Sequence, residues 1–345
     1  MNFSLDFRSD TLTRPTQAML EAMFKARVGD DVFGEDPAIN LLEQQCADYF
    51  GMEAALFCPS GTMTNQIGIN IHTRPGDDVI CEKKSHVYIY EGGGIARNSG
   101  CQVQAIDGDS GRINAEQIRG LINPDDVHRT RTRVVSLENT CNRGGGTCYN
   151  MVDIEAIRSL CDEHGLALHL DGARLWNAIV AQQQDPKVYG RYFDTISVCF
   201  SKGLGTPVGS VLLGTKAMMK QARRVRKVMG GGMRQAGYLA AACSYALEYH
   251  MARLQEDHDL AKQIGQVLST HPMVQQLVPP ETNILIFSLK AGYSPKAICA
   301  EWQKQGILAY PISDTDIRLV THLDIDHAQI PAFLDYLQAY SPTLA

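Results

Sequence analysis

The sequence predicts an α/β protein with a mostly parallel, seven-stranded sheet in a large domain and a smaller α+β domain at the C-terminal end. Two observations lead to this class. From about residue 54, short apolar runs rich in β-branched residues alternate with helical patterns, as in strand-helix-strand units. After His271-Pro272 the alternation gives way to a mixed pattern of short strands and two helices. Mostly parallel sheets are covered by helices on both faces, so their strands are apolar at nearly every position.

Each predicted strand of the large domain is justified by its own apolar run. The seven runs span residues 54–58, 78–82, 102–107, 133–139, 166–171, 195–200 and 210–214. Residues 153–165 between two of them place Ile154, Ile157, Leu160 and Cys161 on one face, which indicates an amphipathic helix. Ligands of such sheets bind at the carboxyl ends of the strands.

Past the seventh run, helices are predicted at 233–254 and about 257–268. The smaller domain is predicted to contain strands at 283–289, 307–312 and 316–323, with helices at 295–305 and 328–339. We therefore expect an N-terminal segment (1–50) packed on both domains, a large cofactor-binding domain (51–255) and a small C-terminal domain (256–345).

Composition excludes several function classes. The chain carries a formal charge of −6, which argues against nucleic acid or anionic membrane as a main partner. No stretch approaches the roughly 18 uninterrupted apolar residues of a membrane helix. The ten cysteines show neither a C-x-x-C pair nor metal-ligand spacing, so no metal site and a reducing, cytoplasmic location are expected.

Lys202 and Asp171 carry the strongest chemical signal. Lys202 follows the run at 195–200 on a glycine-containing turn, and Asp171 ends the run at 166–171. The two residues are 31 positions apart (202 − 171), about one strand-helix-strand crossover. A lysine that forms a Schiff base and a carboxylate that keeps a pyridine nitrogen protonated are what pyridoxal 5'-phosphate requires. A surface lysine and a helix-capping aspartate are the alternative, and the further motifs argue against it.

Two motifs fit the same cofactor. Ser60, Gly61 and Thr62 stand where the first strand turns into a helix, and a helix N-terminus binds phosphate readily. A plain helix cap is the alternative. His86 follows the second strand, where a histidine can lie on the pyridine ring and hydrogen-bond to substrate.

For the remaining candidate residues, the sequence pattern alone does not fix a functional role. Asn139 and Asn142 precede a glycine-rich stretch after the fourth strand and are candidate substrate contacts, although the glycines are also compatible with a mobile turn. Arg234 ends a basic helix and triple glycine, which fits a phosphate contact, possible across subunits, better than a nucleic-acid patch. Arg318, in a small-domain strand, can clamp a substrate carboxylate with both its terminal nitrogens.

Seven motifs in order resemble one family, the low-specificity L-threonine aldolases of the β-eliminating lyases. They are residues 5–11 (LDFRSDT), 29–36 (GDDVFGED), 136–140 (SLENT), 169–174 (HLDGAR), 201–209 (SKGLGTPVG), 230–235 (GGGMRQ) and 318–322 (RLVTH). The resemblance extends from about residue 4 to residue 325. It implies the aspartate aminotransferase-like fold of pyridoxal enzymes of fold type I. The implied reaction is cleavage of L-threonine, L-allo-threonine and related L-β-hydroxy-α-amino acids such as phenylserine to glycine and an aldehyde.

The resemblance also implies roles for individual residues. Lys202 would be the Schiff-base lysine and Asp171 the partner of the pyridine nitrogen, and His86 would stack on the ring. Ser60, Gly61, Thr62 and Arg234 would bind the cofactor phosphate. Arg174 would contact the cofactor and, with Ser9 and Arg318, the substrate carboxylate, while His128 would lie near the β-hydroxyl. Relatives form homotetramers, built from dimers whose active sites draw on both subunits.

This chain departs from its relatives at two positions. Many have tyrosine where this chain has Phe33 and histidine where it has Cys141, and both changes are expected to make the rim of the substrate pocket less polar. The general base stays open between His86, His128 and an ordered water. The alternatives are another pyridoxal-dependent β-eliminating lyase or aminotransferase, or a non-catalytic binding protein without the cofactor.

Overall fold

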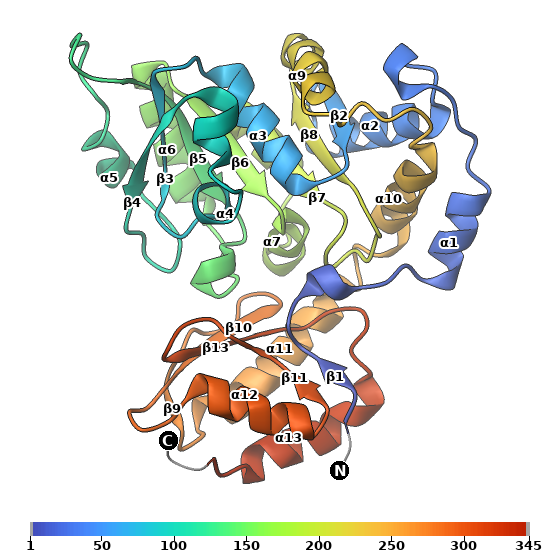
Figure 1. Ribbon diagram of the computed structural model, residues 1–345, viewed down its shortest axis with the longest axis vertical. Helices are drawn as coiled ribbons and strands as arrows, with labels where there is room; N and C mark the ends of the chain where they lie inside the picture. Colours follow the sequence, from blue (N-terminus) through green and yellow to red (C-terminus); the bar gives the residue numbers. More distant parts are fainter. Residues whose placement is uncertain (1–2, 343–345) are drawn as a thin grey trace.

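A seven-stranded sheet forms the centre of the larger part of the molecule (Figure 1), whose computed structural model describes residues 3–342. The strands lie in the order β2-β8-β7-β6-β5-β3-β4. β8 is antiparallel to both its neighbours, and the other pairings are parallel, which confirms the predicted fold class. The strands are β2 (Ala54–Cys58), β3 (Asp77–Glu82), β4 (Gln102–Ile106), β5 (Arg131–Glu138), β6 (Ala167–Gly172), β7 (Thr195–Cys199) and β8 (Ser210–Gly214).

Helices cover both faces of this sheet, which explains the continuous apolar runs. Ile67 and Met219 pack with Leu56 and Leu212 on one face, under the helices α3 (Gly61–His72) and α9 (Lys216–Val228). The opposite face is covered by α2 (Pro37–Phe50), α6 (Met151–His164), α7 (Leu175–Gln182), α8 (Lys187–Tyr192) and α10 (Gly237–Tyr249). Shorter helices are α1 (Gln17–Phe24), α4 (His86–Ile89) and α5 (Ala115–Arg119).

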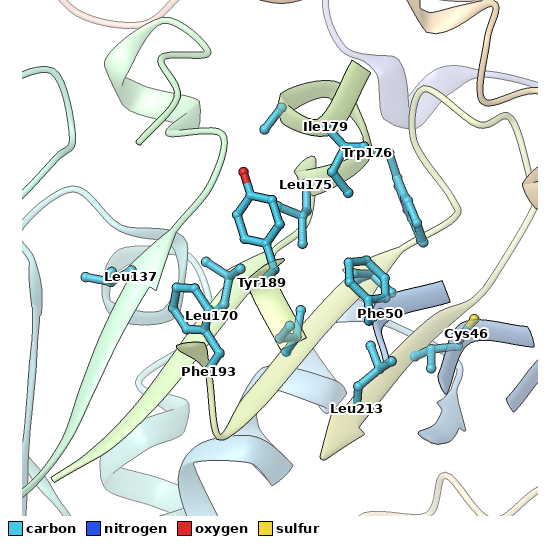
Figure 2. Close-up of a cluster of buried hydrophobic side chains, with 14 of the residues drawn as sticks. Cys46, Phe50, Leu137, Leu170, Leu175, Trp176, Ile179, Tyr189, Phe193 and Leu213 are labelled. Carbon is cyan, nitrogen blue, oxygen red and sulfur yellow. The ribbon is translucent and has the colours of Figure 1, made fainter. Parts of the chain in front are cut away.

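Trp176 of α7 ties this core to the end of β7. Figure 2 shows its indole beside Phe50 among the buried side chains of the cluster, and the two ring centroids are 5.4 Å apart. The indole Nε1 donates a hydrogen bond to the carbonyl oxygen of Cys199 at 2.8 Å. Because Cys199 ends the strand that leads to Lys202, the packing of α7 helps to fix where that lysine emerges.

The smaller part of the molecule contains a second sheet, of four antiparallel strands in the order β12-β13-β10-β9. Its elements are β9 (Val274–Leu277), β10 (Ile284–Leu289), β11 (Ile307–Leu308), β12 (Tyr310–Pro311), β13 (Asp316–Val320), α11 (Leu254–Ser269), α12 (Pro295–Lys304) and α13 (Ile330–Ala339). Two expectations were inexact here. The strand expected at 307–312 is two short strands, and the helix expected at 233–254 begins only at Gly237.

The first residues join the smaller part. β1 (Leu5–Asp6) pairs in parallel with β11, and Phe3, Leu5 and Phe7 belong to the core beneath the four-stranded sheet. The chain then crosses to the larger part, where α1 and α2 pack against α10 (Figure 1). Within residues 3–342 no helix is both long and apolar enough to cross a membrane.

Candidate active site

A cavity of about 600 Å³ lies between the two sheets, at the carboxyl ends of the parallel strands. Both parts of the molecule line it. The larger part contributes His86, Tyr90, Asn142, Arg143, Arg174 and Lys202, the smaller part Tyr310, Pro311, Ile312 and Arg318, and the N-terminal segment Ser9 and Thr11. Predicted site residues distant in sequence therefore meet in one place.

Lys202 is presented to this cavity by the turn after β7. The carbonyl oxygen of Lys202 accepts a hydrogen bond from the backbone N–H of Gly205 at 2.8 Å and another from Thr13 Oγ1 at 2.9 Å. Both contacts fix the backbone and leave the side chain free to reach into the cavity. Its Nζ lies 4.0 Å from Cys199 Sγ.

Asp171 is buried at the end of β6. One carboxylate oxygen accepts from Asn65 Nδ2 at 2.9 Å and the other from the backbone N–H of Ala173 at 3.1 Å. Asn65 is itself held by His169, whose Nε2 is 3.2 Å from Asn65 Oδ1. Burial lowers the pKa of His169 to about 4, so this histidine is neutral near neutral pH and adds no charge beside Asp171.

Glu91 is a site residue that sequence reasoning missed. Its Oε1 is 2.9 Å from His86 Nδ1 and accepts from Asn65 Nδ2 at 2.9 Å, while Oε2 accepts from Gln66 at 2.6 Å. Burial alone would lower the pKa of His86, but Glu91 and Asp171 raise it above the ordinary value. Asn65 thus links the carboxylate behind His86 to the carboxylate of Asp171.

Glu138, the residue beside Asp171 on β5, supports the same corner of the site. Its two carboxylate oxygens accept from the backbone N–H groups of His86 at 2.6 Å and Asn142 at 2.7 Å. Burial, and then the charge of Asp171, raise the pKa of Glu138 to about 7. This carboxylate positions the two loops that carry His86 and Asn142.

Arg174 and Arg318 differ in how far their charges are already neutralised. Arg174 makes a bidentate pair with buried Asp10, at 2.8 and 2.6 Å. Burial raises the pKa of Asp10, but Arg174 more than offsets this and brings it to about 2. Arg318 donates to Asn142 Oδ1 at 2.9 Å and to the carbonyl oxygen of Arg8 at 3.2 Å, and no carboxylate among the described residues pairs with it.

Arg318 also has a buried Nε without a hydrogen-bond partner among residues 3–342. Burial, followed by the nearby charge of Arg174, lowers its pKa to about 10. An unmatched guanidinium is costly in a buried place unless a ligand neutralises it. The Oγ of Ser9 lies at the same cavity and accepts from Thr11.

The N-terminus of α3 lies against the end of β7, the strand that leads to Lys202. Ser60 caps the helix through a hydrogen bond to the N–H of Met63 at 3.2 Å. A Cβ on Gly61 would stand 2.5 Å from Cys199 Sγ, so a glycine is needed for the helix start to approach the end of β7. Ser60 and Thr62 are exposed and therefore free to meet a phosphate.

Five residues named from the sequence lie away from this cavity within one chain, namely His128, Arg234, Phe33, Cys141 and Asn139. His128 is exposed in the loop between α5 and β5, at the amino end of the strands, and contacts Asp126. Figure 1 shows this loop projecting from the side of the larger part that faces away from the smaller one. Arg234 pairs with Asp30 at 2.9 Å and lies over the exposed ring of Phe33.

Cys141 is also away from the cavity, and the structure contradicts its expected place on the pocket rim. Its side chain is buried, and its Sγ donates to the carbonyl oxygen of Glu138 at 3.1 Å. The adjacent glycine-rich turn folds back over it, since the N–H of Cys141 is bonded to the carbonyl oxygen of Thr147. Asn139 is likewise buried away from the cavity, 3.4 Å from the hydroxyl of Tyr189.

Comparisons with known proteins decide the family. The family model of the beta-eliminating lyases matches residues 6–291. The chain belongs to the beta-eliminating lyase family. This lyase is 42% identical over 340 residues to the low specificity L-threonine aldolase of Escherichia coli K12, across 97% of this chain and 99% of the relative. It is 40% identical over 293 residues to the low-specificity L-threonine aldolase of Candida albicans, across 83% and 77%.

Solved structures show the same fold. The threonine aldolase of Leishmania major superposes with a TM-score of 0.85 at 22% identity, covering 97% of this lyase and 98% of that chain. A putative L-allo-threonine aldolase of Listeria monocytogenes gives a TM-score of 0.79 at 22% identity, covering 94% and 93%.

The donor set of this lyase fits pyridoxal phosphate, the family's cofactor. A lysine amine and an imidazole line the cavity, and each matches a different part of the cofactor. A buried carboxylate ends the neighbouring strand β6, and the N-terminus of α3 approaches the end of β7, where they match the ring nitrogen and the phosphate. The unmatched guanidinium of Arg318 lies on the opposite wall, where an amino-acid carboxylate would complete its hydrogen bonds.

Proposed function

We propose that this protein is a pyridoxal phosphate-dependent aldolase that cleaves L-threonine, L-allo-threonine and related L-β-hydroxy-α-amino acids such as phenylserine to glycine and an aldehyde. The observation that carries the proposal is the cavity in which Lys202 and Arg318 face each other from the two parts of the molecule. The identity with low-specificity L-threonine aldolases over nearly the whole chain supports it.

The chain's own residues hold the cofactor and the substrate. Lys202 would supply the amine that attaches the cofactor, and Asp171, oriented by Asn65, would keep the proton on its ring nitrogen. His86 would lie against the ring, and Ser60, Gly61 and Thr62 would receive the phosphate. The cofactor, when bound, would supply a sink for the electrons released at the substrate's α-carbon.

The substrate is oriented by its carboxylate. Arg318 makes the bidentate contact, while Arg174 and Ser9 border the same position. Fixing the carboxylate sets the direction of the Cα–Cβ bond, which determines that this bond is the one broken. A base then removes the β-hydroxyl proton, and the candidates are His86 of the same chain, His128 of a neighbouring subunit and an ordered water.

The proposed assembly is a homotetramer built from dimers, in which Arg234 reaches the phosphate and His128 the β-hydroxyl across subunits. Exposed apolar side chains are available to a partner, notably Phe24 at the end of α1 (89% exposed) and Val228 at the end of α9 (88% exposed). We also propose a cytoplasmic location, since all ten cysteines are buried and unpaired.

Replacement of Lys202 tests the function. The purified wild-type protein should absorb visible light through its cofactor and should convert L-threonine to glycine and acetaldehyde. Lys202→Ala should lose both the protein-linked absorbance and nearly all turnover, while Lys83→Ala, an exposed lysine beside Asp107, should retain both. Formation of 2-oxobutyrate and ammonia instead of glycine and acetaldehyde would make it a β-eliminating lyase. Transfer of the amino group to an added oxo acid would make it an aminotransferase.

A further inference from the structure

The cavity has an excess of positive charge. Four cationic side chains line it, namely Arg143, Arg174, Lys202 and Arg318, and no carboxylate is among its lining residues. Asp10 neutralises Arg174. The proposed function assigns Lys202 to the cofactor and Arg318 to the substrate's α-carboxylate. Of the four cations, Arg143 is therefore the one to which neither a carboxylate of the protein nor a group of the cofactor or substrate has been assigned.

The guanidinium of Arg143 is available to a ligand. Its Nη2 donates to the carbonyl oxygen of Ile312 at 3.2 Å, which lies on the small-domain wall of the cavity. Among residues 3–342, no carboxylate forms an ion pair with it. Asp316 is close enough for Arg143 to act on its charge, but the two oxygens of Asp316 already accept from Ser288 and Ser313.

The backbone around Arg143 is held firmly between the two parts of the molecule. A Cβ on Gly144 would collide with the carbonyl oxygen of Ser110, and one on Gly146 would stand 2.5 Å from Thr282 Oγ1. Thr282 Oγ1 donates to the carbonyl oxygen of Gly146 at 2.8 Å. The glycine-rich turn is therefore a buried joint rather than a mobile loop, and it preorganises Arg143 at the cavity wall.

Arg143 and Arg318 line the same cavity from adjacent positions. Asn142, the residue before Arg143, accepts the hydrogen bond from Arg318, and Tyr310 is paired with Arg318 on the strand that continues to Ile312. An amino acid whose α-carboxylate is bound by Arg318 thus has a second guanidinium within the same cavity, on the side of Ile312.

We propose that this site accepts L-β-hydroxy-α-amino acids whose β-carbon carries a second carboxylate, and that Arg143 binds this carboxylate. The inference rests on the proposed aldolase function. With L-3-hydroxyaspartate the Cα–Cβ bond breaks, the β-hydroxyl loses its proton, and the β-carbon leaves as glyoxylate. The α-carbon gains a proton and becomes glycine, so the reaction needs no oxidant or co-reactant.

The test compares substrates on the cofactor-loaded enzyme. Glyoxylate and acetaldehyde formation give kcat/KM for both diastereomers of L-3-hydroxyaspartate and for L-threonine. In Arg143→Gln, the ratio of the hydroxyaspartate value to the threonine value should fall at least tenfold, which corresponds to about 1.4 kcal/mol. Arg143→Lys keeps the positive charge but loses the planar guanidinium. Its ratio should lie between those of wild type and Arg143→Gln. Arg119→Gln, an exposed change of the same kind on α5, should leave the ratio as in wild type.

A binding measurement separates recognition from turnover. L-Aspartate has both carboxylates but no β-hydroxyl to cleave, and its dissociation constant follows from the change in the cofactor's visible spectrum. Arg143→Gln should weaken L-aspartate at least tenfold relative to L-alanine. The same spectrum shows that the variant is folded and loaded.

Three outcomes would overturn the inference. Wild type that cleaves L-threonine but neither diastereomer of hydroxyaspartate would refute it and leave the aldolase function standing. An equal loss with both substrates in Arg143→Gln would assign Arg143 to the α-carboxylate instead. Wild type that cleaves no β-hydroxy amino acid would refute the proposed function itself, and the inference with it.

Discussion

Glu91 lies behind His86 and sets the charge on its ring. In Glu91→Gln, the isosteric amide can still accept from Asn65 but carries no negative charge, so the pKa of His86 should fall, because a carboxylate favours the protonated imidazole. Titration of the His86 ring by NMR measures this shift. Turnover should fall by less than the roughly 10²–10⁴-fold effect of losing a general base.

The matched control is Glu116→Gln, an exposed carboxylate on α5, which should leave the titration of His86 where it is. An unchanged His86 pKa in Glu91→Gln would show that the 2.9 Å contact does not control this ring.

The predictable site residues lie at the end of a strand or shortly after it. Lys202, Asp171 and His86 could be placed because the carboxyl ends of parallel strands meet at one edge of the sheet. Asp10 and Glu91 could not. Asp10 pairs with a residue 164 positions away, and nothing local in the sequence marks that pairing, although Asp10 belongs to the motif at 5–11. Glu91 contacts the far side of the His86 ring, and no sequence motif or spacing marks it as a site residue.

At the scale of elements, burial on both faces made the strands of the large sheet predictable. β9 was not predicted because the exposed Gln275 and Gln276 separate its two apolar residues, so its four residues show neither an apolar run nor a strict alternation. It lies at the edge of the small sheet, where a strand of four residues gives a weak pattern. The failed placement of Cys141 has a similar origin, since the backbone turn that buries it is not visible in the sequence.

The glycine-rich turn makes an element-scale prediction. Gly146→Ala adds a Cβ at a backbone φ of +74° and 2.5 Å from Thr282 Oγ1, whereas Gly230→Ala adds one at φ +81° in open space. Both variants carry the cost of a left-handed backbone, about 1–2 kcal/mol. Gly146→Ala should lose about 1–3 kcal/mol more of the free energy of unfolding, through overpacking between the domains. Urea unfolding measures the free energy of unfolding of both variants. Equal losses would show that the glycine-rich turn can shift to accommodate the added Cβ without cost.

At the scale of the whole molecule, the proposed role of His128 at the β-hydroxyl predicts that active sites are shared between subunits. Within one chain His128 lies at the amino ends of the strands, away from Lys202. If it serves a neighbour, Lys202→Ala and His128→Phe are each inactive alone, but a mixed oligomer has one site with both residues intact. Refolding the two variants together should restore a substantial share of activity. If instead the mixture stays as inactive as its components, His128 has no such role.

The pairing of β1 with β11 has a consequence for the way the chain is made. Residues 5–6 leave the ribosome about 300 positions before residues 307–308, which complete their strand pair. At roughly 5–20 residues per second, Phe3, Leu5 and Phe7 wait on the order of 15–60 s for the core they belong to. The larger sheet can form in that interval, whereas the small domain must close around a strand synthesised well before the rest of that domain. Vectorial synthesis therefore delays the joining of the two walls of the cavity until almost the whole chain has emerged.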